Sequence, residues 1–296
     1  MLYASTRSLA LALAFALTLT ACDASIDDAT ADLTETEQTE AAYLVADALA
    51  EDTGGLLASA SDLTASVSPN GLSEGPRSVR GNRRAVACRG GDQSVSYDAG
   101  TGTHTVTYAC SQSNPVGERS YAATLLYQFR DASGGFVARP DANWESVASV
   151  GFDGEREGSV SMSRGEFSAA STFEQSSDWS LTGLGDAASP AVFSVEQQRS
   201  GTSTRTGPRG DGSREFDITL TGTGIELVPA ADGTGYAASG ELSYTLTMEV
   251  VRGDRTVERE VEGTITLDGT ERGLLRILGL RGAYRISLGD GATSRT

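Results

Sequence analysis

The chain contains no lysine and only one histidine among its 296 residues. All 23 cationic side chains are arginines, and they face 40 carboxylates, which gives a formal net charge of −17. A phosphate-binding loop of the Walker type needs a lysine, and nucleic-acid binding needs clustered cations. Neither is expected here. Two explanations fit the missing lysine: a mutational bias of the genome, or an acidic surface adapted to salt.

The single histidine limits the chemistry further. A serine nucleophile needs a base beside it, and a zinc site usually draws on several histidine or cysteine ligands. His104 lies in a strand-like run with no metal-ligand or nucleophile spacing around it, so we interpret it as a strand residue. We expect no catalytic residue, no metal site and no cofactor.

The chain also lacks a long hydrophobic run. Its most apolar stretch, residues 9–19, follows a single cation, Arg7, and is shorter than the ~20 residues of a membrane-spanning helix. That length is typical of the apolar core of a secretory signal. The sequence therefore predicts an exported protein with a signal peptide at residues 1–21.

The signal ends in the run Leu19-Thr20-Ala21-Cys22. This run resembles the lipobox of bacterial lipoproteins, in which a branched apolar residue and two small residues precede a cysteine. The resemblance implies cleavage before Cys22, lipidation of its thiol and acylation of the new amino terminus. It places the protein in the cell envelope, anchored to a membrane and facing the periplasm or the cell exterior. Cleavage removes only Arg7, which leaves 22 arginines, 40 carboxylates and a net charge of −18.

Three cysteines are an odd number for an exported chain. If Cys22 carries the lipid, Cys88 and Cys110 remain as a pair, and an oxidising compartment would join them. Such a bridge would stabilise the fold by about 3 kcal/mol in the chain-entropy model.

The chain divides by pattern into an acidic tether, a helical segment, a linker and a β-domain. The tether covers residues 22–33, and the helical segment, residues 34–65, opens with a capping box formed by Thr34 and Glu37. Apolar residues then recur at helical spacing up to Gly54 and Gly55, which we expect to end the first helix. The linker covers residues 66–83 and is rich in Ser, Pro, Gly and Asn.

From residue 84 to 296 the hydrophobic pattern has period two. Alternation of this kind predicts strands with one buried and one solvated face. Turn signals such as Asp153-Gly154 and Asp268-Gly269 punctuate the runs and give about 11 to 13 strands. The predicted fold is all-β: an antiparallel meander curled into a barrel-like or two-layer sheet, preceded by the short helical segment.

Two further sequence features are candidate functional motifs. Residues 71–75 match the G-x-S-x-G string of a nucleophile elbow, but prolines on both sides exclude the strand and helix that an elbow needs. A cluster of arginines in the linker stands out against the acidic background. It either pairs with the acidic surface of the protein itself or binds headgroups or a partner. Its members are Arg77, Arg80, Arg83 and Arg84.

These patterns lead to one main expectation and one alternative. We expect a non-catalytic, lipid-anchored envelope protein with a structural or interaction role, attached to the membrane through Cys22 and meeting an envelope protein. The alternative is a ligand-binding lipoprotein whose curled sheet holds either the acyl chain of a lipid ligand or a glycan. That alternative is an analogy at the level of the fold.

Overall fold

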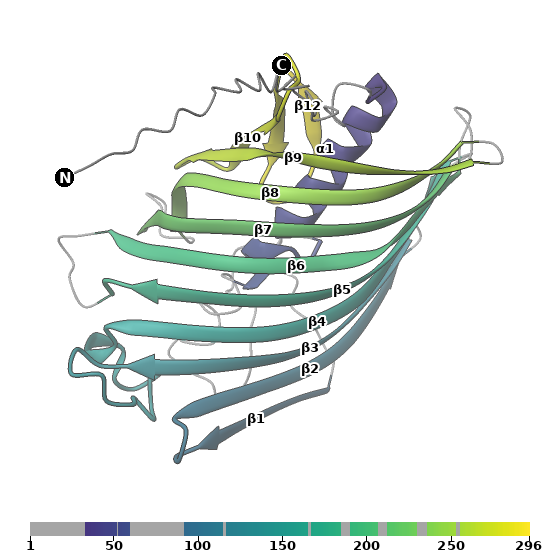
Figure 1. The fold of residues 1–296 in the computed structure, drawn as a ribbon. Coiled ribbons are helices and arrows are strands. Elements are labelled where there is room, and N and C mark those ends of the chain that lie inside the picture. Colours follow the sequence, from purple (N-terminus) through teal and green to yellow (C-terminus); the bar gives the residue numbers. More distant parts are fainter. Residues whose placement is uncertain are drawn as a thin grey trace, which may run out of the picture.

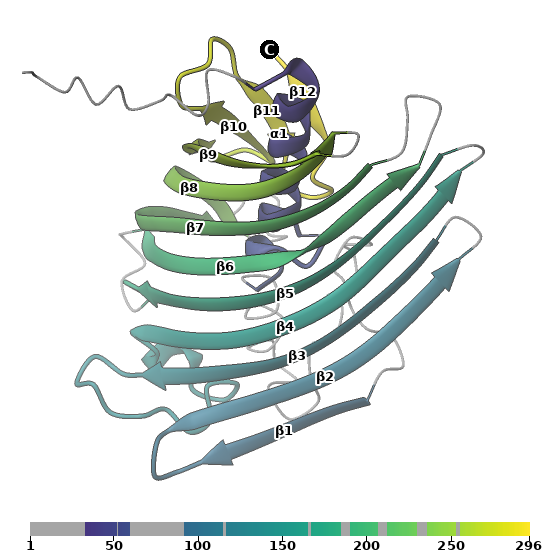
Figure 2. The same cartoon turned by 45° about the vertical axis from the view of Figure 1, so that its right-hand side comes forward.

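A computed structural model describes residues 33–51, 53–59, 92–114, 117–164, 167–184, 190–206, 212–229, 236–252 and 255–296. These residues form one antiparallel sheet whose strand order equals the chain order, with a helix lying across one face (Figures 1 and 2). The predicted all-β meander is confirmed, and it is a single curled sheet that does not close. The signal peptide, most of the tether, the linker, Cys22 and Cys88 lie outside the described residues.

The elements run as a helix, a first group of long strands and a short C-terminal group. Their bounds are α1 (Glu35–Leu49), β1 (Asp92–Asp98), β2 (Thr103–Asn114), β3 (Gly117–Arg130), η1 (Trp144–Ser146), β4 (Ser149–Arg164), β5 (Phe167–Thr182), β6 (Ala191–Thr206), β7 (Gly212–Pro229), β8 (Tyr236–Arg252), β9 (Arg255–Asp268), β10 (Arg272–Ile277), β11 (Tyr284–Ser287) and β12 (Thr293–Arg295).

The capping box predicted at the start of α1 is present. Thr34 Oγ1 accepts from the Glu37 backbone N–H, and Glu37 Oε2 accepts from the Thr34 backbone N–H at 2.8 Å. The helix ends at Leu49, several residues before the expected stop at Gly54 and Gly55, and residues 56–59 form one further helical turn. The chain becomes extended at Ala50, and polar side chains of the sheet bond the last carbonyls of the helix, as described below.

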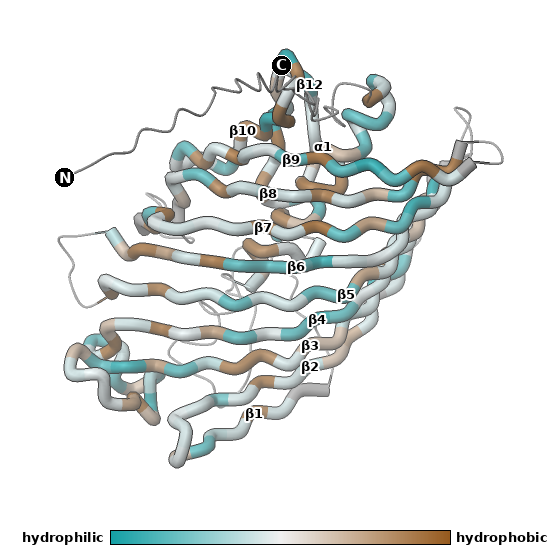
Figure 3. The backbone as a smooth tube through the Cα atoms, viewed as in Figure 1, coloured by the Kyte–Doolittle hydropathy of each residue, from teal (hydrophilic) through white to brown (hydrophobic). Residues whose placement is uncertain are grey.

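The core lies between α1 and the face of the sheet that α1 covers, which we call the inner face. Directly paired residues of neighbouring strands share a face, so the register assigns every strand residue to the inner or the outer face. Alternation of hydrophobic and hydrophilic residues along β7 to β9 shows the same division (Figure 3). The buried alanines Ala41, Ala42 and Ala48 line the helix where it approaches the sheet. Small side chains there let helix and sheet come close together.

An aromatic cluster fills the inner face of β3 to β6. Its central pair is Phe152 and Trp179, whose rings stack with centroids 4.4 Å apart. Tyr127 and Phe193 contact this pair, and Phe129 stacks on Tyr127. Offset aromatic pairs add about 0.5–1.5 kcal/mol each beyond the area that they bury. This half of the core therefore rests on ring packing rather than on α1.

Two of the turn signals have different outcomes. Asp268-Gly269 forms the turn between β9 and β10, with Gly269 at a φ of 80°. The turn predicted at Asp153-Gly154 is wrong, because both residues lie inside β4. A Cβ on Gly154 would lie 2.4 Å from the ring of Phe152, so this glycine makes room for an aromatic side chain within a strand.

Candidate functional site

The two faces of the sheet carry opposite charge. Throughout β4 to β9, every arginine whose side chain is described faces inward and every such carboxylate faces outward. The inward arginines are Arg156, Arg199, Arg205, Arg214 and Arg259. The outward carboxylates are Asp153, Glu155, Glu157, Glu174, Asp178, Glu196, Glu215, Asp217, Glu226, Glu241, Glu249, Glu258, Glu260, Glu262 and Asp268.

Helix α1 supplies the negative charge that the inner face lacks. Glu40 Oε2 lies 2.6 Å from Arg214 Nη2, and Asp47 Oδ2 lies 2.7 Å from Arg199 Nη2. Two further ion pairs join the start of the helix to later strands: Glu37 with Arg259 of β9 at 3.8 Å, and Glu35 with Arg295 of β12 at 2.8 Å. The helix is thus held along its length by carboxylate–arginine pairs that reach from β6 to β12.

The most buried of these groups is Arg199, whose side chain is 1% exposed. Besides the Asp47 carboxylate, its Nη1 donates to the backbone oxygens of Asp47 and Thr53 at 3.4 and 3.3 Å. Its guanidinium carbon also lies 3.7 Å from the ring centroid of Phe173, in cation–π geometry. The planar guanidinium of Arg199 therefore contacts two carbonyls, a carboxylate and an aromatic ring at the same time.

Two more inner-face side chains bond the end of α1 and the turn that follows it. Gln197 Nε2 donates to the Ala48 carbonyl at 2.8 Å, and Arg156 Nη1 donates to the Gly54 carbonyl at 2.8 Å. The last carbonyls of a helix have no partner within the helix and attract cations. The last turn of α1 contains no basic residue of its own, so the sheet provides the cap.

Burial shifts the ionisation of the paired groups. Desolvation raises the pKa of Asp47 although Arg199 lies beside it, and desolvation lowers the pKa of Arg199. The pKa of Glu40 is likewise raised by burial, against the attraction of Arg214. A buried ion pair is weak evidence for stability because desolvation opposes its attraction, so we assign these pairs the role of fixing where α1 docks.

This polar cluster is what the sequence analysis missed. Gln175, Ser177, Gln197 and Arg199 occupy inward positions of β5 and β6, where alternation predicts apolar residues. Polar residues at these inward positions indicate that a polar group packs against the inner face of the sheet. That group is the end of α1, whose last carbonyls accept from Gln197 and Arg199.

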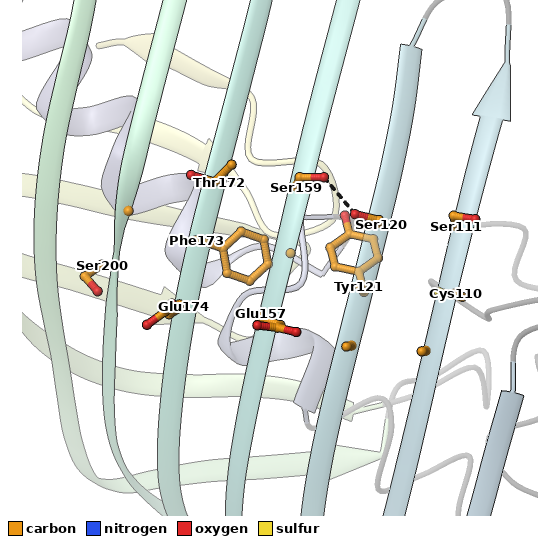
Figure 4. Close-up of a pocket in the computed structure, with 14 residues that line it drawn as sticks. Cys110, Ser111, Ser120, Tyr121, Glu157, Ser159, Thr172, Phe173, Glu174 and Ser200 are labelled. Carbon is orange, nitrogen blue, oxygen red and sulfur yellow. Dashed lines mark hydrogen bonds between the residues drawn. The ribbon is translucent and has the colours of Figure 1, made fainter.

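A shallow hollow of about 740 Å³ lies over β2 to β6 (Figure 4). Outward-facing serine, threonine and glutamate residues make up half of its lining, and Ser120 Oγ and Ser159 Oγ lie 2.7 Å apart across β3 and β4. Glu157 and Glu174 stand directly opposite each other. Like charges in direct opposition destabilise a strand pair, so this face contributes solubility rather than stability.

The predicted site residues have separate places. His104 is 4% exposed in β2, its ring centroid lies 4.4 Å from that of Tyr97, and burial lowers its pKa. Cys110 lies in β2 opposite Tyr121. Since Cys88 is outside the described residues, the disulfide stays a prediction, and so do lipidation of Cys22 and the role of Arg77, Arg80, Arg83 and Arg84.

Within the described part of the chain, no group of three or more His, Cys, Asp or Glu side chains is arranged to hold a metal ion. None of the described helices is long and apolar enough to cross a membrane. No protein-family model matches the chain, and neither a curated protein nor a solved structure is significantly similar to it.

Proposed function

We propose that this chain is a non-catalytic, lipid-anchored envelope protein with a structural or interaction role. The observation that supports the proposal is the occupied inner face. In a sheet curled to enclose a ligand, the inner face should be open and apolar with a few polar groups. Here α1 lies across it: sheet arginines bind carboxylates of the helix, and Arg199 and Gln197 bind its last carbonyls. The surfaces left for partners are then the outer face and the ends of the sheet.

Membrane attachment is tested by exporting the full chain with Cys22→Ser in a bacterial host. We expect the parent to sediment with membranes and to be released by detergent, whereas C22S stays in the soluble fraction. Mass spectrometry of the parent should show acyl chains on the peptide that begins at residue 22. Unchanged sedimentation of C22S, with no acyl mass on the parent, would refute the anchor.

The alternative role, binding of an acyl chain or glycan, is favoured by one observation. Trp179 is 2% exposed, and its Nε1–H has no hydrogen-bond partner among the residues that the structure describes. Buried donors are nearly always satisfied, so a ligand or a water would complete this site. Native mass spectrometry of C22S separates the two roles: a co-purified ligand would favour the alternative, and a ligand-free spectrum would favour the filled structural domain.

A further inference from the structure

The C-terminal end of the sheet differs in charge from the rest of the protein. Residues 272–296 contain five arginines and one carboxylate, Asp290, in a chain whose net charge is −17. All five arginines are exposed. Arg295 pairs with Glu35, and none of the other four forms an ion pair with the described residues. These four are Arg272, Arg276, Arg281 and Arg285.

One exposed and two half-buried leucines lie among these arginines. Leu278 follows β10 and is 63% exposed, which is more than any other large hydrophobic side chain in the described part of the chain. Leu274 faces outward on β10 between Arg272 and Arg276, and Leu280 follows in the connection to β11. With the glycines of that connection the leucines line a hollow of about 590 Å³, most of whose lining is apolar. We call this surface of leucines and arginines the β10–β11 surface.

The β10–β11 surface lies at the end of the molecule where α1 begins. Arg295 Nη1 of β12 donates to Glu35 Oε1 at 2.8 Å, and both α1 and the last strands meet there (Figure 1). Cys22 precedes Glu35 by 13 residues. A flexible chain of that length has an average end-to-end distance of about 20 Å. An anchor at Cys22 would therefore hold this end, rather than the β1 edge, next to the bilayer.

We propose that the β10–β11 surface binds the headgroup region of an anionic phospholipid bilayer. Arginines near such a surface attract its phosphates, and each contributes about 1 kcal/mol to the binding free energy, as in a polybasic segment. Leucines that enter the boundary between headgroups and acyl chains are removed from water. The nearest carboxylates lie beside only part of this surface: Asp268 of β9 and Glu271 flank Arg272, and Glu262 lies next to Leu278. Arg276 pairs with Thr264, and Arg285 pairs with Leu274 and Ser294, so the attraction rests on these two arginines and on Arg281 of the connection. The location of this surface rests on the proposed anchor, but its chemistry does not.

Binding is measured with the full chain carrying Cys22→Ser, so that no lipid anchor contributes. The protein is sedimented with vesicles of phosphatidylcholine alone or of phosphatidylcholine and phosphatidylglycerol in equal parts, at 150 mM salt. We expect at least tenfold stronger partitioning into the anionic vesicles. The double variant Arg276→Gln/Arg281→Gln should lose about thirtyfold, since two charges contribute about 1 kcal/mol each. Leu278→Ser should lose about tenfold.

Matched controls are available at distant positions. Arg139 is an exposed arginine in the β3–β4 connection, at least six strands away from β10, and Val251 is 55% exposed in the β8–β9 hairpin. Arg139→Gln and Val251→Ser should partition like the parent. Equal binding to both kinds of vesicle, no binding, or equal losses from the controls and the test variants would overturn the proposal. These outcomes differ from failure of the anchor, which is read from fractionation of C22S in cells.

Discussion

Loss of the Arg199 guanidinium should release α1 from the sheet. In Arg199→Leu the carboxylate of Asp47 and the carbonyls of Asp47 and Thr53 lose a donor, while all three stay near the inner face. Removing one partner of a buried ion pair typically destabilises a protein by about 3–5 kcal/mol, because an uncompensated charge remains. The cation–π contact with Phe173 is lost as well. We therefore expect a loss of about 3–5 kcal/mol in the free energy of unfolding.

Two measurements test this value. Urea denaturation gives the global loss, and amide hydrogen exchange shows where protection disappears. We expect α1 to lose protection while β3 to β5, which pack around the aromatic cluster, keep it. Arg139→Leu is the control: its pair with Asp141 is at the surface, with the arginine side chain 71% exposed, and should contribute less than about 1 kcal/mol.

The double variant Asp47→Asn/Arg199→Leu separates the charge from the carbonyl bonds. If the unpaired carboxylate causes most of the loss, the second substitution should restore part of the stability. A loss for Arg199→Leu as small as that for Arg139→Leu, with α1 still protected, would refute the docking role assigned to Arg199.

Three further predictions follow from burial, close packing and the cysteines. Burial raises the pKa of Asp47 above its usual 3.8, so the contribution of this group to stability is present below pH 3.8 and is lost as pH rises through the folded-state pKa. The free energy of unfolding of the parent relative to Asp47→Asn, measured in urea from pH 3 to 7, should therefore fall as pH rises. A rise would contradict the shift. A Cβ on Gly201 would lie 2.0 Å from a backbone oxygen, so Gly201→Ala should lower the free energy of unfolding by about 1–3 kcal/mol. Gly151→Ala should be neutral, because a Cβ there would have no atom within 4 Å. Equal effects of the two substitutions would show that close packing at Gly201 does not limit the size of the side chain. Maleimide should label neither Cys88 nor Cys110 in the folded, exported C22S protein until it is reduced, and two free thiols would rule out their disulfide.

The fold class was readable from the sequence because side-chain alternation has a direct physical cause. Leu242, Tyr244 and Leu246 alternate with polar residues, and all three are buried in β8. The capping box of α1 was readable for a similar reason, since its bonds join residues three positions apart. The turn at Asp153-Gly154 was predicted wrongly, because the sequence does not distinguish a glycine that leaves space for the Phe152 ring from a glycine in a turn.

The docking cluster could not be located in the same way. Asp47 and Arg199 are 152 positions apart, and no local pattern pairs them. Arg199 alone could equally be an exposed strand residue, a ligand for an anion or a partner for any of 40 carboxylates. Only the register of β5 with β6, which sets Gln175 opposite Arg199, shows that polar residues gather on the inner face.

The sequence by itself determined the strand alternation, the helix start and the acidic, lysine-free composition, because each depends on residue type and short spacing. The tertiary structure decided that the sheet stays open, that α1 lies across it, and that arginine faces inward while carboxylate faces outward. The physical reason is that strand parity assigns a face only once register and curvature are known. A charge pattern spread over β4 to β9 therefore becomes visible only when the strands lie side by side.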